Sequence, residues 1–110
     1  MILLDTHIWI WWAASPQKLS AKATDRILKE EKQNSIGVSV ISCWEIGMLV
    51  AKGRVGFSLD VEEWIDKSLK LPQVKLLELT PHIAVLSSRL QGNPPADPAD
   101  RILIATAKAH

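Results

Sequence analysis

The sequence has little cysteine and almost no net charge, and no hydrophobic run is long enough to span a membrane. Its 110 residues include a single cysteine, Cys43, which excludes an internal disulfide and any metal site built from several cysteines. This cysteine usage suits a reducing compartment. The formal net charge of +1 gives no strong field for a polyanion, so binding to nucleic acid would need a local basic patch.

The hydrophobic start, MILLDTHIWIWW, has the pattern of neither a signal peptide nor a transmembrane helix. No positive charge precedes it, Asp5 and His7 interrupt it, and no small-residue cleavage site follows. It is also too short and too polar to cross a bilayer. We therefore expect a cytoplasmic protein with no membrane partner. A composition of 47% hydrophobic and 23% charged residues fits one soluble globular domain.

Strand and helix patterns alternate along the chain. Short β-type runs are expected at 2–4, 36–40 and 74–79, and helical patterns at 18–32, 42–52, 60–69, 80–90 and 97–107. The last helix is apolar nearly all round between Ile102 and Ala107, so we expect it to be buried. This alternation predicts an α/β fold with a parallel sheet that helices cover on both faces.

Acidic side chains fall where such a sheet places its ligands. In open α/β sheets, ligands bind beyond the carboxyl ends of the strands. Asp5 follows the first strand directly, and Glu45 lies in the expected first turn of the helix after the second strand. Asp100 lies in the first turn of the last helix, near its positive end. All three are candidates for a common site.

Each of these sites also has a purely structural explanation. Asp5 and Asp97 suit the N-cap position of the helices that follow them. Ser42 and Glu45 have the Ser-x-x-Glu spacing of a capping box, in which each side chain satisfies a backbone N–H group. Asp100 is less well explained, because it begins one of the most apolar helices in the chain.

Taken together, the three carboxylates are expected to meet in one acidic cleft. Clustered carboxylates repel one another unless a cation neutralises them. Mg²⁺ or Mn²⁺ is the natural partner, because these hard ions take oxygen ligands and keep several waters that can meet phosphate oxygens. Such an ion can polarise a phosphodiester and activate a bound water.

Three sequence blocks resemble one family, and they span nearly the whole chain. The blocks LLDTH, SVISCWEIG and DPADRILIATA are similar in order and spacing to PIN-domain nucleases, especially the VapC-type toxins of bacterial toxin–antitoxin pairs. The resemblance implies a three-layer α/β/α fold and a Mg²⁺- or Mn²⁺-dependent ribonuclease. It also implies an RNA substrate, a homodimer and a cognate antitoxin.

The resemblance also assigns roles to individual residues. The catalytic acids fall on Asp5, Glu45 and Asp100, of which Asp5 and Asp100 would bind the metal ion. Supporting roles fall on Thr6, Ser42 and Asp97. Arg101 is a possible RNA contact, or it pairs with a nearby carboxylate instead.

The chain departs from the family pattern at its C-terminal end. Family members usually continue into another strand that ends in a further acidic residue, whereas this sequence stops at His110. We therefore expect one PIN domain over 1–110 that is short at the C-terminus, with the last strand or strands and the fourth acid missing. A truncated form, a site with three acids and completion by a partner chain are all compatible with this pattern.

Other functions stay open. A catalytically impaired PIN-like module would bind an antitoxin or RNA without cleaving. A phosphatase of the haloacid-dehalogenase type also begins with a strand-terminal aspartate, but it needs a second aspartate where this chain has His7. Trp9, Trp11 and Trp12 cannot all face one core, so we expect at least one of them to be exposed on a dimer or antitoxin surface.

Overall fold

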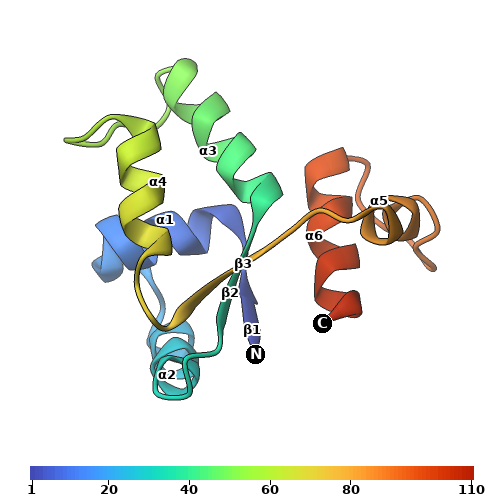
Figure 1. Cartoon of the computed structure of the whole chain (residues 1–110), viewed down its shortest axis with the longest axis horizontal. Helices are drawn as coiled ribbons and strands as arrows, with labels where there is room; N and C mark the ends of the chain where they lie inside the picture. Colours follow the sequence, from blue (N-terminus) through green and yellow to red (C-terminus); the bar gives the residue numbers. More distant parts are fainter.

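The computed structural model describes residues 1–110 and contains a three-stranded parallel sheet with helices packed around it (Figure 1). Strands β1 (Ile2–Leu4), β2 (Ile36–Ser39) and β3 (Val74–Leu77) lie side by side in the order β1-β2-β3. Ile36 of β2 pairs with Ile2 on one side and with Val74 on the other. Because both pairs are parallel, the carboxyl ends of all three strands lie at one edge of the sheet.

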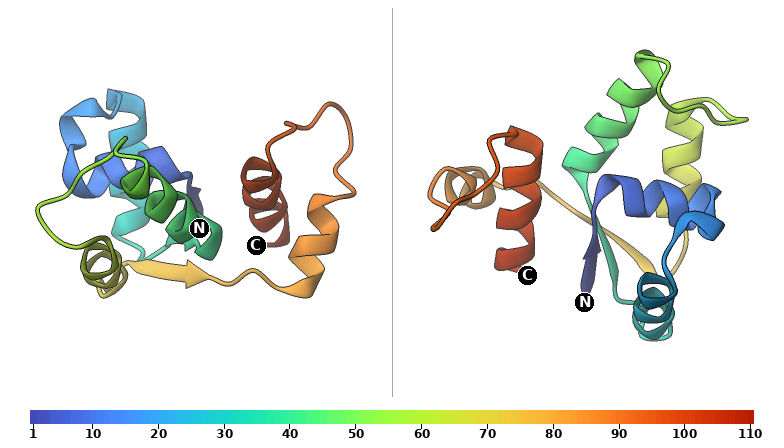
Figure 2. Two further views of the ribbon diagram at one scale, coloured as in Figure 1. Left: turned by 90° about the horizontal axis from the view of Figure 1, so that it is seen from above. Right: turned by 180° about the vertical axis from the view of Figure 1, so that it is seen from behind.

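The helices are α1 (Thr6–Ala14), α2 (Ala21–Glu31), α3 (Val40–Ala51), α4 (Val61–Leu69), α5 (Pro81–Ser87) and α6 (Pro98–Ala109), with a short 3₁₀ helix η1 (Pro16–Lys18). Figures 1 and 2 show α5 and α6 on one side of the strands and α1, α2 and α4 on the other. The predicted α/β architecture is confirmed. No helix combines the length and the apolar character that crossing a membrane would require.

Most of the helices begin directly after a polar N-cap residue. The N-caps that accept a hydrogen bond from a first-turn N–H include Asp5, Ser20, Asp60, Thr80 and Asp97. Helix α3 also ends as expected. Gly53, just past the C-cap, adopts a φ of 70°, in the left-handed region that glycine enters without strain.

Aromatic packing fixes α1 against α4. Trp9 is fully buried, and its ring lies 5.6 Å from that of Trp64. Trp11 and Trp12 are partly buried and pack against the same core. None of the three is therefore exposed as predicted, although Trp11 and Trp12 keep part of their surface accessible. The exposed tryptophan is Trp44 of α3, which keeps 58% of its surface accessible.

Helix α6 is less buried than its composition predicts. Only Ala99, Ala105 and Thr106 are buried, while Ile104 is exposed. The helix packs against α5 and α3 through one face. Figure 2 shows the α5–α6 pair standing beside the sheet rather than enclosed between layers, which explains why its other apolar face stays open.

Candidate active site

Asp5 lies at the carboxyl end of β1, and Thr6 begins α1 immediately after it. The Oδ1 atom of Asp5 accepts a hydrogen bond from the Ile8 N–H group at 2.9 Å, so the N-cap prediction is confirmed. The cap uses one carboxylate oxygen. The side chain is exposed, and its second oxygen has no protein partner. Capping therefore fixes the carboxylate at the edge of the sheet and leaves its second oxygen free to bind a ligand.

A hydrogen bond from Thr6 positions Glu45. The Thr6 hydroxyl donates to Glu45 Oε1 at 2.6 Å and lies 2.9 Å from Ser42 Oγ. One hydroxyl carries one proton, and the shorter contact to a carboxylate takes it, so Ser42 is left to donate to Thr6. Thr6 and Ser42 are buried, whereas Glu45 is partly exposed. This short network joins α3 to the start of α1, one residue from Asp5.

The capping box predicted for Ser42 and Glu45 is wrong. Helix α3 begins at Val40, and its cap is Ser39, whose hydroxyl accepts from the Ile41 N–H group at 3.1 Å. Ser42 therefore lies in the first turn and Glu45 in the second. The β-branched pair Val40 and Ile41 extends the apparent strand pattern of β2, which hid the earlier helix start. With the cap supplied by Ser39, Glu45 has no capping role.

The third acid lies at the start of α6. Asp97 Oδ1 accepts a hydrogen bond from the Asp100 N–H group at 3.1 Å, and Pro98 occupies the first helical position. The predicted cap is confirmed. Asp100 is exposed in the first turn, and helix α6 packs against α3, the helix that carries Glu45.

Arg101 does not pair with a carboxylate. Its Nε donates to the Ser87 carbonyl at 3.0 Å, and its Nη1 donates to the Pro95 carbonyl at 3.3 Å. The guanidinium therefore ties the end of α5 and the loop that follows it to the start of α6. Its remaining N–H groups are left for other ligands, and an RNA contact stays a prediction.

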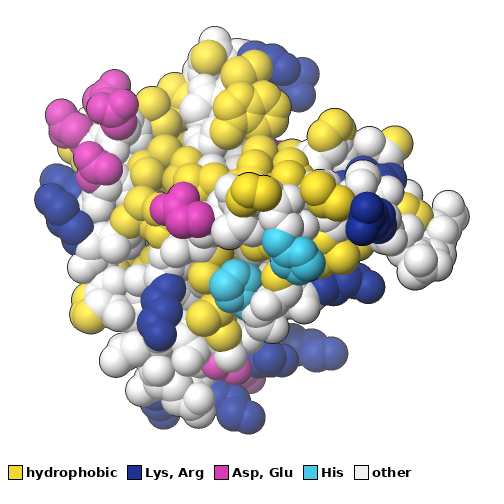
Figure 3. Space-filling model, turned by 45° about the vertical axis from the view of Figure 1, so that its right-hand side comes forward, with side chains coloured by type: hydrophobic (Ala, Val, Ile, Leu, Met, Phe, Trp, Pro, Cys, Tyr) yellow, Lys and Arg dark blue, Asp and Glu magenta, His cyan; other side chains and the backbone are white.

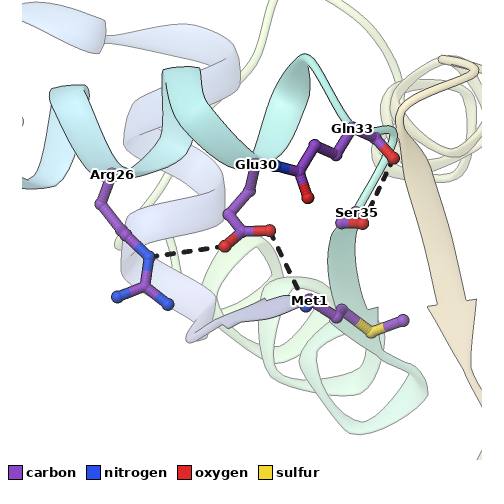
Figure 4. Close-up of polar contacts among 5 residues, drawn as sticks. All are labelled: Met1, Arg26, Glu30, Gln33 and Ser35. Atoms are coloured by element: carbon purple, nitrogen blue, oxygen red, sulfur yellow. Dashed lines mark hydrogen bonds and ion pairs between the residues drawn. The ribbon is translucent and has the colours of Figure 1, made fainter.

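None of the three candidate acids takes part in an ion pair. The two ion pairs of the structure join Glu30 to the Met1 amino group at 3.7 Å and to Arg26 at 3.6 Å (Figure 4). Met1 precedes β1, so these pairs lie toward the amino end of that strand. Asp5 lies at its opposite end, at a cavity whose wall also includes Lys22 and Arg26, although neither base forms an ion pair with it.

A further acid, absent from the predicted set, lies at the same edge. Glu78 directly follows β3, as Asp5 follows β1, and this position after a strand is the signal that could have identified it. Burial raises the pKa of the Cys43 thiol on α3, its backbone hydrogen bond lowers it, and the negative charge of Glu78 raises it further. The charge of Glu78 thus affects the thiol of a residue on α3.

The donor chemistry of these acids suits a hard divalent ion, but their arrangement does not form a complete metal site. No three Asp, Glu, His or Cys side chains are placed to hold one ion together. The convergence of the three carboxylates on a single cleft therefore stays a prediction. Figure 1 shows the α5–α6 pair beside the sheet, and Asp100 belongs to the first turn of α6, whereas the Thr6 hydrogen bond ties Glu45 to the start of α1.

Comparison with known proteins identifies the family. The sequence pattern of the PIN domain matches residues 2–110. The chain is 34% identical over 109 residues to Ribonuclease VapC22 of Mycobacterium tuberculosis (strain ATCC 25618 / H37Rv), and this match covers 99% of the chain and 80% of the relative. No solved structure matches it. The sequence matches and the parallel sheet with acids at its carboxyl edge agree, and the chain belongs to the PIN-domain family, among its VapC-type members.

Proposed function

We propose that this chain is a divalent-metal-dependent endoribonuclease that acts in the cytoplasm as the toxin of a toxin–antitoxin pair. The observation that carries the proposal is the Thr6 hydrogen bond that ties Glu45 to the residue directly after Asp5, at an edge of the sheet where neither acid forms an ion pair. Membership of the PIN-domain family and the ribonuclease name of the M. tuberculosis relative support the same reaction.

The proposed roles follow from which oxygen atoms are free. Asp5 and Asp100 would hold Mg²⁺ or Mn²⁺, because both are exposed and offer carboxylate oxygens that accept no hydrogen bond. When bound, the ion would polarise the phosphodiester and stabilise the leaving oxygen. Glu45 Oε2, the oxygen that Thr6 does not use, would accept a proton from the attacking water. Ser42 and Thr6 would keep that carboxylate in one orientation.

Two aspartates at the start of α6, the N-cap Asp97 and the first-turn Asp100, offer a matched test of these roles. Asp97→Asn keeps the cap, because asparagine caps a helix as well as aspartate does. Asp100→Asn removes the same charge three residues away, from the side chain assigned to the metal ion. With single-stranded RNA and Mn²⁺, we expect Asp100→Asn to lose cleavage and Asp97→Asn to keep it. Equal activity in the two variants would contradict the assignment.

A second function has one observation in its favour. The three acids do not gather around a common point, which fits a PIN-like module that binds RNA or an antitoxin without cleaving. Wild-type chain that binds RNA but leaves it intact in both Mg²⁺ and Mn²⁺ would favour this alternative over the nuclease.

The proposed protein partners are a second copy of the chain and a cognate antitoxin. Several exposed hydrophobic side chains come from α3 and from the segments around α5 and α6, namely Trp44, Met48, Leu79, Val85 and Ile104. Figure 3 shows hydrophobic side chains gathered across the middle of the side that carries α6. A homodimer would cover this surface. An apolar groove between α1 and α4, lined by Trp12, Leu59 and Leu71, would receive an antitoxin segment.

Sedimentation at roughly tens of micromolar, where dimers with micromolar dissociation constants are populated, tests the first partner. Trp44→Ser should shift the chain toward monomer, because it removes the most exposed hydrophobic side chain. Wild-type chain that sediments only as a monomer would count against the dimer.

A further inference from the structure

A small polar pocket lies where α1, η1 and the segment after α3 meet. Its volume is about 240 Å³, and its wall includes His7 and Trp11 of α1, Lys18 of η1, and Arg54 and Phe57 of the segment between α3 and α4. His7 lies in the first turn of α1, the turn that Asp5 caps. The pocket therefore begins two residues from a proposed catalytic acid, although no proposed catalytic residue lines it.

The charge of this pocket favours an anion. Lys18 and Arg54 are exposed, and neither takes part in an ion pair. No aspartate or glutamate contributes to the wall. Because the whole chain carries a net charge of only +1, two uncompensated cations at one small pocket make a local positive patch.

Aromatic rings at the same pocket favour a nucleobase. The Trp11 and His7 rings lie 6.2 Å apart at an interplanar angle of 59°. Phe57 is held by stacking on Trp64, with ring centroids 4.3 Å apart and an angle of 12°. Proteins bind single-stranded nucleic acid by combining cations, which meet the backbone, with aromatic faces, on which bases stack. Sequence-specific RNA recognition also targets unstacked bases in this way.

We propose that this pocket binds one nucleotide of a single-stranded RNA, close to the nucleotide whose phosphodiester is cleaved. The inference rests on the proposed ribonuclease function and specifies its substrate contacts. The pocket is smaller than the clefts that bury drug-sized ligands, so it would take no more than a single nucleotide. Lys18 and Arg54 contact phosphate, and Trp11 or Phe57 offers a face to the base. An acidic protein segment could use the two cations, but it has no need of the aromatic rings.

Equilibrium binding of a fluorescein-labelled, mixed-sequence single-stranded RNA tests the pocket, with a chelator present so that nothing is cleaved. Lys18→Gln and Arg54→Gln should each raise Kd several-fold. Each should also reduce the slope of log binding constant against log salt by about 0.7, the share of one phosphate contact on a single strand. Lys29→Gln is the matched control, because Lys29 is exposed on α2, does not line the pocket and forms no ion pair. It should leave both quantities close to wild type.

Variants of Trp11 distinguish the contribution of base stacking to RNA affinity from the contribution of charge. Trp11→Leu should weaken binding without changing the salt slope, and Trp11→Phe should restore most of the affinity. A melting curve for each variant identifies loss of fold, and the lysine and arginine variants keep the test decisive if Trp11→Leu unfolds.

The outcomes distinguish this inference from the proposed function. If Lys18→Gln and Arg54→Gln bind RNA no worse than Lys29→Gln, the pocket assignment is overturned, even where the wild-type chain cleaves RNA. Variants that lose binding to an acidic protein partner while keeping RNA affinity also overturn it. If the pocket variants weaken RNA binding but the wild-type chain never cleaves, the nuclease function fails and the nucleotide pocket stands.

Discussion

Thr6 donates a hydrogen bond to Glu45 Oε1 over 2.6 Å, and the two residues are 39 positions apart in the sequence. The bond joins the first turn of α1 to the second turn of α3 at the edge of the sheet where Asp5 lies. Since Thr6 is buried, solvent does not compete strongly for its hydroxyl. The orientation of the proposed catalytic glutamate therefore depends on a neutral residue next to the proposed metal ligand.

Replacing Thr6 tests this dependence. Thr6→Val keeps the shape but removes the hydroxyl, which frees Glu45 and leaves Ser42 without its partner. We expect RNA cleavage to fall about tenfold or more, because small misplacements of a catalytic group are costly. The free energy of unfolding should fall by about 1–2 kcal/mol. Thr6→Ser keeps the hydroxyl and should restore most of the activity. Cleavage by Thr6→Val at the wild-type rate would show that this hydrogen bond does not position Glu45.

Arg101 should stabilise the α5–α6 pair through the two carbonyls that it binds. Arg101→Ala leaves the Ser87 and Pro95 carbonyls without this donor, and we expect a loss of about 1–2 kcal/mol in the free energy of unfolding. Arg89 is exposed in the same region and donates to no carbonyl through its side chain, so Arg89→Ala should change stability by less than about 0.5 kcal/mol. Urea titrations of the two variants with equal midpoints would contradict the role given to Arg101.

Cys43 should react slowly with alkylating reagents. Burial, opposed by its backbone hydrogen bond and reinforced by Glu78, raises the pKa of its thiol above the ordinary value of 9.0. The pKa of the thiol is therefore higher in the folded chain than in the unfolded chain. Keeping the thiol protonated stabilises the fold fully below pH 9, and this contribution is lost as pH rises through the folded pKa.

Alkylation rates with iodoacetamide from pH 7 to 10 measure this shift, since only the thiolate reacts. Glu78→Gln removes the nearby negative charge and should move the rate profile to lower pH. The urea-unfolded chain supplies the unshifted reference. Identical profiles for folded and unfolded chain would show that burial does not govern the thiol.

Divalent metal should bind weakly in the absence of RNA. The structure holds Glu45 near Asp5 but gathers no three acidic ligands around one point, so waters or substrate phosphate must complete the coordination. Titration calorimetry with Mn²⁺ should show one weak site at most, and Asp100→Asn should weaken it further. Two tight sites per chain would contradict this arrangement of acids.

Features of the fold that depend on neighbours in sequence could be predicted. Asp5 and Asp97 cap helices because a short polar side chain accepts a hydrogen bond from the N–H group three residues ahead. Gly53 ends α3 for an equally local reason, its left-handed backbone. The parallel sheet followed from the alternation of strand and helix patterns.

The remaining features depend on contacts between distant segments. The position where β2 ends decides whether Glu45 caps a helix or accepts a hydrogen bond from the Thr6 hydroxyl. The β-branched residues Val40 and Ile41 obscured that boundary. The partners of Arg101 are carbonyls set by the path of a loop, which composition does not specify. The exposure of Ile104 depends on how α6 packs beside the sheet, so its apolar sequence alone suggested a burial that does not occur.

The most direct test of the account is RNA cleavage by Asp5→Asn in Mg²⁺ or Mn²⁺, measured together with thermal unfolding. Asparagine still accepts the Ile8 N–H bond, so the cap survives and only the carboxylate charge is removed. We expect cleavage to be lost while the melting temperature stays at the wild-type value. A purified Asp5→Asn chain that cleaves RNA at the wild-type rate would contradict the proposal that the acids at this edge of the sheet perform the reaction.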